Sequence, residues 1–311
     1  MSEQPLVSVV ITAYNRAWIV SEAIDSVLRQ TYKNVEIVVV DDGSSDNLAE
    51  VLEPYGDKIK CYSKDHGGCA SALNKGYEMA SADYIALLDS DDVWHEEKLE
   101  KQIKALTGPG DFDLCINDIQ IMDEDSNYLR LTNLRKHIPK DGIIFEDMLR
   151  QPPMTSSYVM FHRRVMDYIG PFSETLKTGI DYDFLMRASA FFRFAVIAEP
   201  LTYYRYSPDS MKKLFSGSRL TSLTQFQEKF PEKAAEYANE IKEARARYHL
   251  NYADDLLWHR YIKAAQCELK QSLAESSSSE AWKMLIKSYM IQALSLVVPK
   301  YRDKGERERL N

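Results

Sequence analysis

The sequence predicts an α/β fold in which a mostly parallel β-sheet is flanked by helices, followed by a helical C-terminal extension. Strand-like and helix-like segments alternate four times near the N-terminus, an order typical of parallel sheets with helical crossovers. The strand-like segments are continuous apolar runs such as "IVVV", which suit strands covered on both faces. Beyond about residue 212 only helical periodicity remains.

The four predicted strands are short and rich in β-branched residues, and a helical pattern follows each one. We expect strands at 6–14, 35–40, 58–63 and 84–88, and helices at 17–30, 45–54, 70–81 and 95–106. In a sheet of this kind, ligands bind outside the carboxyl ends of the strands. The residues that directly follow each strand are therefore the candidates for a binding site.

The C-terminal third carries long amphipathic patterns and a serine-rich break, "SLAESSSSEAW", before a final helix expected at 280–298. We therefore expect a first domain over 1–212, with halves at 1–100 and 101–212, and a helical extension over 213–311. The final helix has only a narrow polar stripe, so it could dock on the first domain, pair two chains or lie on a membrane. Packing or dimerisation is the favoured interpretation.

Composition and charge exclude several classes of protein. The net charge is -8, and no basic run interleaved with aromatic residues occurs outside the last few positions, so a nucleic-acid partner is not expected. The four cysteines form neither a CxxC pair nor a regular spacing, which argues against a zinc site or a disulfide framework. No signal peptide or membrane span is recognisable, which predicts a cytoplasmic protein, with the inner face of the cell membrane left open.

Polar clusters follow three of the four predicted strands. "TAYNR" (12–16) follows the first, "DDGSSD" (41–46) the second, and "DSDD" (89–92) the fourth. Because the carboxyl ends of parallel strands meet at one edge, we expect these clusters to lie close together. The first turn lacks GxGxxG, which counts against a dinucleotide cofactor.

The acidic cluster "DSDD" predicts a divalent cation. Clustered carboxylates repel one another unless a cation neutralises them, and oxygen ligands suit Mg²⁺ or Mn²⁺ rather than zinc. Such an ion commonly bridges protein carboxylates to substrate phosphates. Gly67 and Gly68 precede a predicted helix, whose N-terminus favours a phosphate neighbour. Taken alone, "DSDD" could instead be a solvated turn that caps the next helix.

Four blocks of sequence together resemble the family 2 glycosyltransferases of the GT-A fold. They are "SVVITAYNR", "VEIVVVDDGSSD", "GGCASALNKGYEMASADYIALLDSDD" and "GIDYDFLMRAS". Their order and spacing match as well, and the resemblance covers about residues 6–210. Members of this family are mostly inverting enzymes that use nucleotide-diphosphate sugars, so the resemblance implies such an enzyme here. It also implies that 1–100 is the donor-binding half and 101–212 the acceptor-binding half.

The resemblance also implies a class of substrates. A UDP-sugar donor is favoured over GDP or dTDP, because an acidic residue at the base suits the imide of uracil, although thymine presents the same edge. Transfer of a hexosyl or N-acetylhexosaminyl group is expected. The acceptor expected by family analogy is a hydroxyl of a saccharide or a lipid-linked saccharide, in surface polysaccharide or glycoconjugate synthesis.

Residue by residue, the resemblance first assigns the nucleotide. It places Thr12, Tyr14 and Asn15 around the base and ribose. It makes Asp42 the acceptor for the base imide, and it puts Asp65 near the base. Tyr14 could instead simply pack as an aromatic residue at a strand end.

The resemblance next assigns the metal. The DxD motif of the family becomes Asp89 to Asp91, with Asp91 as the direct ligand of Mn²⁺ or Mg²⁺. Asp89 and Ser90 are expected to bind the donor nucleotide, with Asp89 nearer the ribose. Asp92 is a possible support.

The catalytic base is expected in "GIDYDFLMRAS". Inverting transfer needs a group that takes the proton from the acceptor hydroxyl during its attack. The resemblance gives this role to Asp181, with Arg187 as possible support. Ile180 stands where the family more often has Glu, so Asp183 is the alternative base if the register is shifted. Asp181 could also be a first-turn carboxylate that faces the helix dipole.

A departure from the family pattern occurs at Ser207, where many members have a His that contacts the metal or the diphosphate. Arg205 or Lys212 could help to neutralise the phosphates instead. The segment 151–164 is expected to form a wall of the acceptor pocket, because its prolines and hydroxyls interrupt the helical pattern.

Two other functions are compatible with parts of the sequence. "LLDSDDV" also fits the motif of haloacid-dehalogenase-type phosphatases, but that motif normally ends the first strand, whereas three strand units precede it here. A catalytically silent sugar-nucleotide-binding protein on the same fold is suggested only by Ser207 and Ile180. The lone histidines His66 and His162 are expected to be structural.

Overall fold

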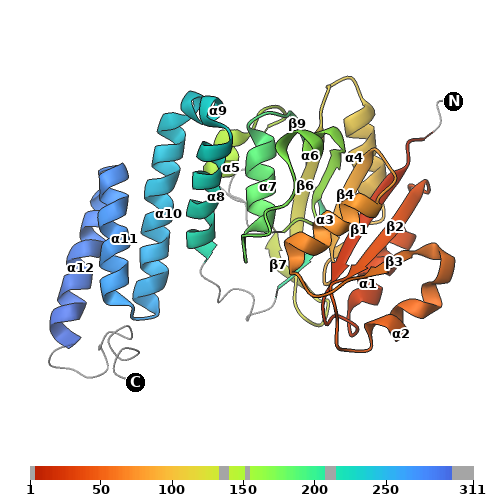
Figure 1. Ribbon diagram of the computed structural model, residues 1–311, viewed down its shortest axis with the longest axis horizontal. Helices are drawn as coiled ribbons and strands as arrows, with labels where there is room; N and C mark the ends of the chain where they lie inside the picture. The colour runs from red at the N-terminus through yellow and green to blue at the C-terminus, as the bar shows by residue number, and fades with distance from the viewer. Residues whose placement is uncertain (1–3, 133–139, 151–154, 207–214, 296–311) are drawn as a thin grey trace. The chain divides into compact units, whose positions relative to one another are not determined.

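The computed structural model describes residues 4–132, 140–150, 155–206 and 215–295. The chain divides into two compact units, Met1–Met211 and Lys212–Asn311. The described part of the first unit contains the β-sheet, and the described part of the second unit is helical (Figure 1).

A single mixed sheet runs through the first unit, in the order β3-β2-β1-β4-β8-β6-β9-β5, with β7 paired to β6. β1 to β4 pair in parallel, β8 is antiparallel to its neighbours β4 and β6, and β9 is parallel to β6. The four predicted strands are present, each end within about two residues. The strands are β1 (Val7–Ala13), β2 (Val35–Asp41), β3 (Lys60–Ser63), β4 (Tyr84–Asp89), β5 (Val93–Trp94), β6 (Leu114–Met122), β7 (Tyr128–Thr132), β8 (Val159–His162) and β9 (Phe194–Arg205).

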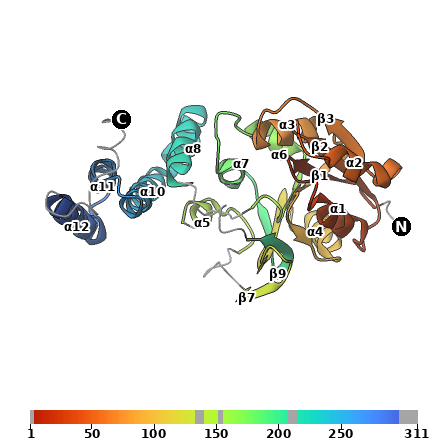
Figure 2. The ribbon, with the colours of Figure 1, turned by 90° about the horizontal axis from the view of Figure 1, so that it is seen from below.

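Helices cover both faces of the sheet, as the continuous apolar strands predict. Figure 2 shows α3 and α6 on one side of the sheet and α1 and α4 on the other. α3 approaches β1 closely, because a Cβ added at Gly76 would lie 2.2 Å from the Val10 side chain. The helices of this unit are α1 (Val20–Leu28), α2 (Leu48–Leu52), η1 (Glu53–Lys58), α3 (Cys69–Met79), α4 (Lys98–Thr107), α5 (Phe145–Arg150), α6 (Arg164–Ile169) and α7 (Ile180–Ser189).

The strand register aligns the ends of the parallel strands. Thr12 lies opposite Asp89 in the β1–β4 pair, and Asp41 lies opposite Ser63 in the β2–β3 pair. Asp41 also lies opposite Ala13 of β1. The loops that follow β1, β2, β3 and β4 therefore leave the sheet from one edge, as expected from the sequence.

The second unit packs its helices around a small apolar core. α10 packs against α8 and α11, and α11 packs against α12. Leu256, Leu269 and Leu285 are buried between them. None of the described helices is long and apolar enough to cross a membrane. The helices are α8 (Phe215–Lys229), α9 (Pro231–Glu236), α10 (Ala238–Trp258), α11 (Ile262–Glu275) and α12 (Ser279–Ser295).

Candidate functional site

The loops after β1 and β2 are joined by hydrogen bonds from backbone amides to polar side chains. The N–H of Asn15, which has a φ of 53°, donates to Ser44 Oγ at 3.0 Å. Asn15 Oδ1 accepts from the N–H of Ser45 at 2.8 Å, and the N–H of Ala17 donates to Asp46 Oδ2 at 2.9 Å. Asn15 therefore holds the two loops together at the edge where the nucleotide is expected.

Asp42 lies in a cradle formed by the loop between β3 and α3. Its Oδ1 accepts from Lys64 Nζ at 2.7 Å and from the N–H of Gly67 at 3.0 Å, and its Oδ2 accepts from the N–H of Gly68 at 2.8 Å. His66 Nδ1 lies 2.9 Å from Oδ2. Burial raises the pKa of Asp42, but the hydrogen bonds from Lys64 and the two glycines outweigh it and leave the pKa below its ordinary value.

Tyr14 lies beside this cradle. Its ring is exposed and stacks on the ring of His66, with centroids 4.0 Å apart and planes 23° apart. Gly43 allows the backbone at His66 to lie close to the loop after β2: its φ is +77°, and a Cβ there would lie 2.7 Å from the backbone nitrogen of His66. Asp65 is exposed in the same loop. The structure therefore brings Tyr14 and Asp42 together through His66, and Asp65 lies in the loop that carries His66.

Hydroxyl groups hold the carboxylate of Asp89. Thr155 Oγ1 donates to it at 2.8 Å and Ser156 Oγ at 2.9 Å, while the N–H of Asp89 donates to Ser157 Oγ at 2.9 Å. Burial, and after it the charge of Asp91, raises the pKa of Asp89, and the hydroxyl hydrogen bonds partly offset this rise. The acidic turn is thus stabilised by neutral donors as well as by any cation.

Asp92 is buried at the base of the same turn. Its Oδ2 accepts from Ser157 Oγ at 2.5 Å and lies 2.9 Å from Thr155 Oγ1, and its Oδ1 accepts from the N–H of Arg205 at 3.0 Å. Burial, and then the charge of Asp89, raises its pKa well above the ordinary value. With a side chain 1% exposed and engaged on both oxygens, Asp92 fixes the turn and does not face a cation directly.

Asp91 is the most accessible carboxylate of the turn, with 36% of its side chain exposed. Arg16 Nε lies 3.7 Å from its Oδ2, and Ser90, just before it, is buried. Among the described residues, no three His, Cys, Asp or Glu side chains converge on a metal-binding point. A lone accessible carboxylate suits Mg²⁺ or Mn²⁺ that takes its other ligands from substrate phosphates and water. The residues present are compatible with the expected ion, and Asp91 stays its predicted protein ligand.

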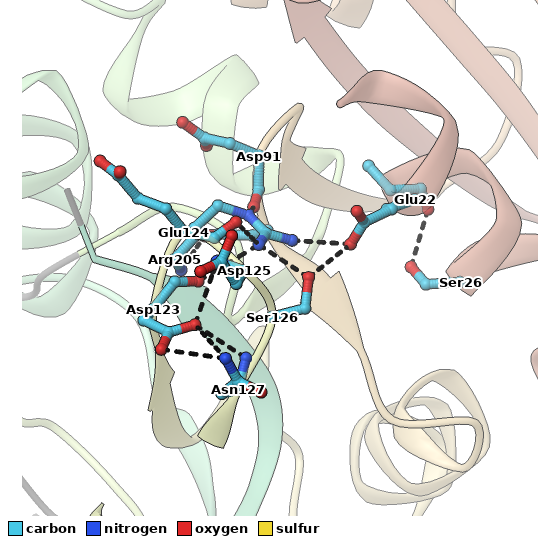
Figure 3. A network of polar contacts seen from close by, with 11 residues as sticks. Glu22, Ser26, Asp91, Asp123, Glu124, Asp125, Ser126, Asn127 and Arg205 are labelled. Carbon is cyan, nitrogen blue, oxygen red and sulfur yellow. Dashed lines mark hydrogen bonds and ion pairs between the residues drawn. The ribbon is translucent and has the colours of Figure 1, made fainter. Parts of the chain in front are cut away.

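Arg205 joins this turn to two other segments (Figure 3). Its side chain is 3% exposed, and its Nε donates to the carbonyl oxygen of Asp91 at 2.9 Å. One terminal nitrogen donates to Glu22 Oε2 at 2.7 Å, and the other donates to Ser126 Oγ at 2.8 Å and to the carbonyls of residues 123–124 at 3.2 and 3.0 Å. Protein acceptors thus surround the Arg205 guanidinium and join it to the main chain of Asp91, while its possible help in neutralising the phosphates stays a prediction.

Asp181 lies in the first turn of α7, directly after Gly179, which has a φ of 69°. Desolvation of the Cys69 thiol, and after it the charges of Asp89 and Asp181, raise the pKa of Cys69 to about 12. A hydrogen bond with Thr12 acts in the opposite direction. Asp89 and Asp181 are thus near enough to Cys69, the first residue of α3, for their charges to act on its pKa. The role of Asp181 as the base stays a prediction.

Asp183, the alternative base, has a different environment. It is 1% exposed, and its Oδ2 lies 2.8 Å from a terminal nitrogen of Arg187, which is itself 4% exposed. Arg187 also donates to the carbonyls of residues 169–171 at 2.8 to 3.2 Å. The buried ion pair with Arg187 counts against Asp183 as the base, and Arg187 contacts Asp183 in this structure. The roles expected of Asp181 and Arg187 stay predictions.

The remaining expectations concern two loops. Ser207, Lys212 and residues 151–154 lie outside the described residues. Within 155–157 of the expected acceptor wall, the three hydroxyls contact the acidic turn instead. The run "TSS" was the available signal, but hydroxyl residues in a loop do not by themselves identify their partners.

The chain matches the model of the family described as "Glycosyl transferase family 2" over residues 8–170. An uncharacterized glycosyltransferase of Rickettsia typhi is 34% identical over 204 residues, 62% of this chain and 63% of that protein. The amylovoran biosynthesis glycosyltransferase AmsB of Erwinia amylovora is 33% identical over 207 residues, 63% of this chain and 68% of that protein. The matched region spans 26% to 63% of the length of five Rickettsia relatives.

Solved structures share the fold at low sequence identity. TarS of S. aureus, in complex with UDP-GlcNAc, superposes with a TM-score of 0.62 at 16% identity, covering 92% of this chain and 91% of that one. The mannosyltransferase PcManGT of Pyrobaculum calidifontis, in complex with GDP-Man and Mn²⁺, gives 0.59 at 19% identity, covering 97% and 83%. The fold is GT-A, and the phosphatase interpretation is excluded. The match over more than half of its residues places this chain in glycosyl transferase family 2.

Proposed function

We propose that this glycosyltransferase is an inverting, metal-dependent enzyme that transfers a hexosyl or N-acetylhexosaminyl group from a UDP-sugar to a saccharide hydroxyl. The observation that supports the proposal is the pair of carboxylates that follow parallel strands at one sheet edge, Asp42 in its cradle after β2 and the accessible Asp91 after β4. Asp181, at the start of α7, is near enough to Cys69 to raise its pKa together with Asp89. The UDP-GlcNAc complex of a GT-A neighbour supports UDP, and the GDP-Man complex of another makes GDP the alternative to test.

The base subsite is formed by Tyr14 and Asp42. An exposed aromatic ring offers a stacking face for a planar base, and a carboxylate accepts the imide N–H of uracil. Because the pKa of Asp42 lies below its ordinary value, this acceptor stays ionised at neutral pH. Thr12, Asp65, Asp89 and Ser90 complete the nucleotide site in this proposal.

The diphosphate subsite lies at Asp91, which would hold Mn²⁺ or Mg²⁺. The bound ion would neutralise negative charge on the diphosphate leaving group. The chain's own contribution is positional. Arg205 holds the main chain of Asp91, and the hydroxyls of residues 155–157 hold Asp89 and Asp92.

Asp181 acts as general base. Its carboxylate takes the proton of the acceptor hydroxyl as the hydroxyl oxygen attacks the anomeric carbon. The bond from that carbon to the diphosphate oxygen breaks on the opposite side, the leaving UDP takes the electron pair, and the configuration inverts. A position in the first turn of α7 favours the ionised carboxylate through the helix dipole.

The test is a donor screen with the purified chain. UDP-glucose, UDP-GlcNAc and GDP-mannose are incubated with and without Mn²⁺, and nucleoside diphosphate release and thermal shift are measured. The proposal expects Mn²⁺-dependent stabilisation by UDP-sugars and slow UDP release. Stabilisation without any release would instead indicate a silent binding protein, and preference for GDP-mannose would overturn the UDP assignment.

We also propose that the acceptor is a lipid-linked or growing surface saccharide, reached from the cytoplasmic side. The relative named for amylovoran biosynthesis supports polysaccharide synthesis. On α12, Trp282, Ile286 and Met290 are exposed on one side, which suits membrane contact or pairing of two chains. Vesicle flotation and light scattering separate these two outcomes, and a monomer that binds no vesicles contradicts both.

A further inference from the structure

The carboxylate proposed to receive the base already has a full set of neighbours. Lys64 and the N–H of Gly67 contact Asp42 Oδ1, and the N–H of Gly68 and the ring of His66 contact Oδ2. An ionised carboxylate has about four lone-pair sites. Lys64 and the two glycine N–H groups fill three of these sites, and the His66 ring lies against Oδ2. An imide N–H can therefore reach Oδ2 most directly if the His66 ring moves aside.

His66 is the group that can leave most easily. Its side chain is 52% exposed, whereas that of Lys64 is 22% exposed and also donates to the carbonyl of Asp65 at 2.6 Å. The two glycine donors are backbone groups at the start of α3, so they cannot move without shifting the helix. Only the His66 ring can rotate away and leave the cradle intact.

The His66 ring also lies against Tyr14, the aromatic residue of the proposed base subsite. His66 stacks on Tyr14 at 4.0 Å while its Nδ1 lies 2.9 Å from Asp42 Oδ2. The imidazole is a planar ring that places a nitrogen beside Asp42, 3.1 Å from its main-chain oxygen and 2.9 Å from Oδ2, and a face against a tyrosine. A uracil base offers the same two features.

We propose that His66 occupies the base subsite in the donor-free protein and is displaced by the uracil of the donor. This inference rests on the proposed function, because it takes UDP as the ligand. Only molecules in which His66 has swung away bind the donor, so the apparent Kd is the intrinsic Kd divided by their fraction. His66 is therefore a built-in competitor that sets donor affinity.

The experiment measures UDP binding by calorimetry in the presence of Mn²⁺. His66→Ala is compared with the wild type and with His162→Ala, a matched control in β8 whose ring packs edge-on against Tyr84. If His66 fills the subsite in most molecules, His66→Ala should bind UDP on the order of three- to tenfold more tightly. His162→Ala should bind as the wild type does.

Unchanged or weaker UDP binding by His66→Ala would overturn the inference, while leaving the proposed function in place because the wild type still binds. Failure of all three proteins to bind UDP would overturn both. NMR on ¹³C-histidine-labelled protein gives a second readout. The His66 ring signals should lose the ring-current shift of Tyr14 when UDP is added, and their persistence in the UDP complex would contradict displacement.

Discussion

Replacement of Arg205 by lysine should loosen the Asp91 turn while keeping a positive charge. The guanidinium donates to the carbonyl of Asp91, to Ser126 Oγ and to two further carbonyls, in addition to its ion pair with Glu22. A lysine ammonium has three donors and no planar fork, so it can keep only some of these bonds.

The expected loss can be worked from these contacts. Because the Glu22 side chain is 47% exposed, its ion pair contributes less than about 1 kcal/mol. If two of the buried bonds to neutral acceptors are lost at ~1 kcal/mol each, the free energy of unfolding should fall by about 2 kcal/mol. The Asp91 turn should also become less ordered, which weakens the metal-dependent part of UDP binding.

Urea unfolding and calorimetry of UDP binding, with and without Mn²⁺, provide the assay. Metal-free UDP binding should not change in Arg205→Lys, because Tyr14 and Asp42 lie in other loops. Arg245→Lys is the control, since Arg245 pairs with Glu275 in the second unit, and it should affect neither quantity strongly. Arg205→Lys with wild-type unfolding and wild-type Mn²⁺ dependence would refute the positioning role.

Three further substitutions test separate parts of the structure. Asp91→Asn should abolish the Mn²⁺-stimulated part of UDP binding in calorimetry with an unchanged unfolding curve, and retained stimulation would exclude Asp91 as the ligand. Asp183→Asn should lower the free energy of unfolding by roughly 3–5 kcal/mol, because it leaves the buried Arg187 charge unpaired; a stability loss below about 1 kcal/mol in urea would contradict the buried pair. Burial lowers the pKa of Lys98 to about 7, so the unfolded chain binds a proton that the folded chain lacks between about pH 7 and 10. Wild-type stability should therefore gain from this group as pH rises through that range, and Lys98→Met, measured by urea unfolding at each pH, should lack that gain; identical pH profiles would show that Lys98 stays charged in the fold.

The parallel half of the sheet could be predicted because its sequence signals are local. Each of β1, β2 and β4 is an apolar run that ends in polar residues, and the strand ends predicted to converge do converge. The second half could not be predicted in this way. β6 pairs with β8 and β9, which lie far along the chain, and no local pattern specifies such partners.

The sequence predicted which residues belong to the candidate site better than it predicted the hydrogen bonds and ion pairs that these residues make. Asp183 and Arg187 are four residues apart on a helix, a spacing that favours an ion pair, so their pairing could have been inferred from the sequence. The four contacts of Asp42 could not, because they depend on how the loop between β3 and α3 folds back over "DDG". The same holds for the hydroxyls that contact Asp89.

The central claim is that Asp181 is the general base of an inverting sugar transfer. The most direct measurement is UDP release from a saturating UDP-sugar by Asp181→Asn, with UDP and Mn²⁺ affinity measured on the same protein. Asp181→Asn should release UDP more slowly by a factor on the order of a hundred or more, the usual scale for losing an acid–base group, with both affinities near the wild-type values. Transfer by Asp181→Asn at close to the wild-type rate would contradict the claim.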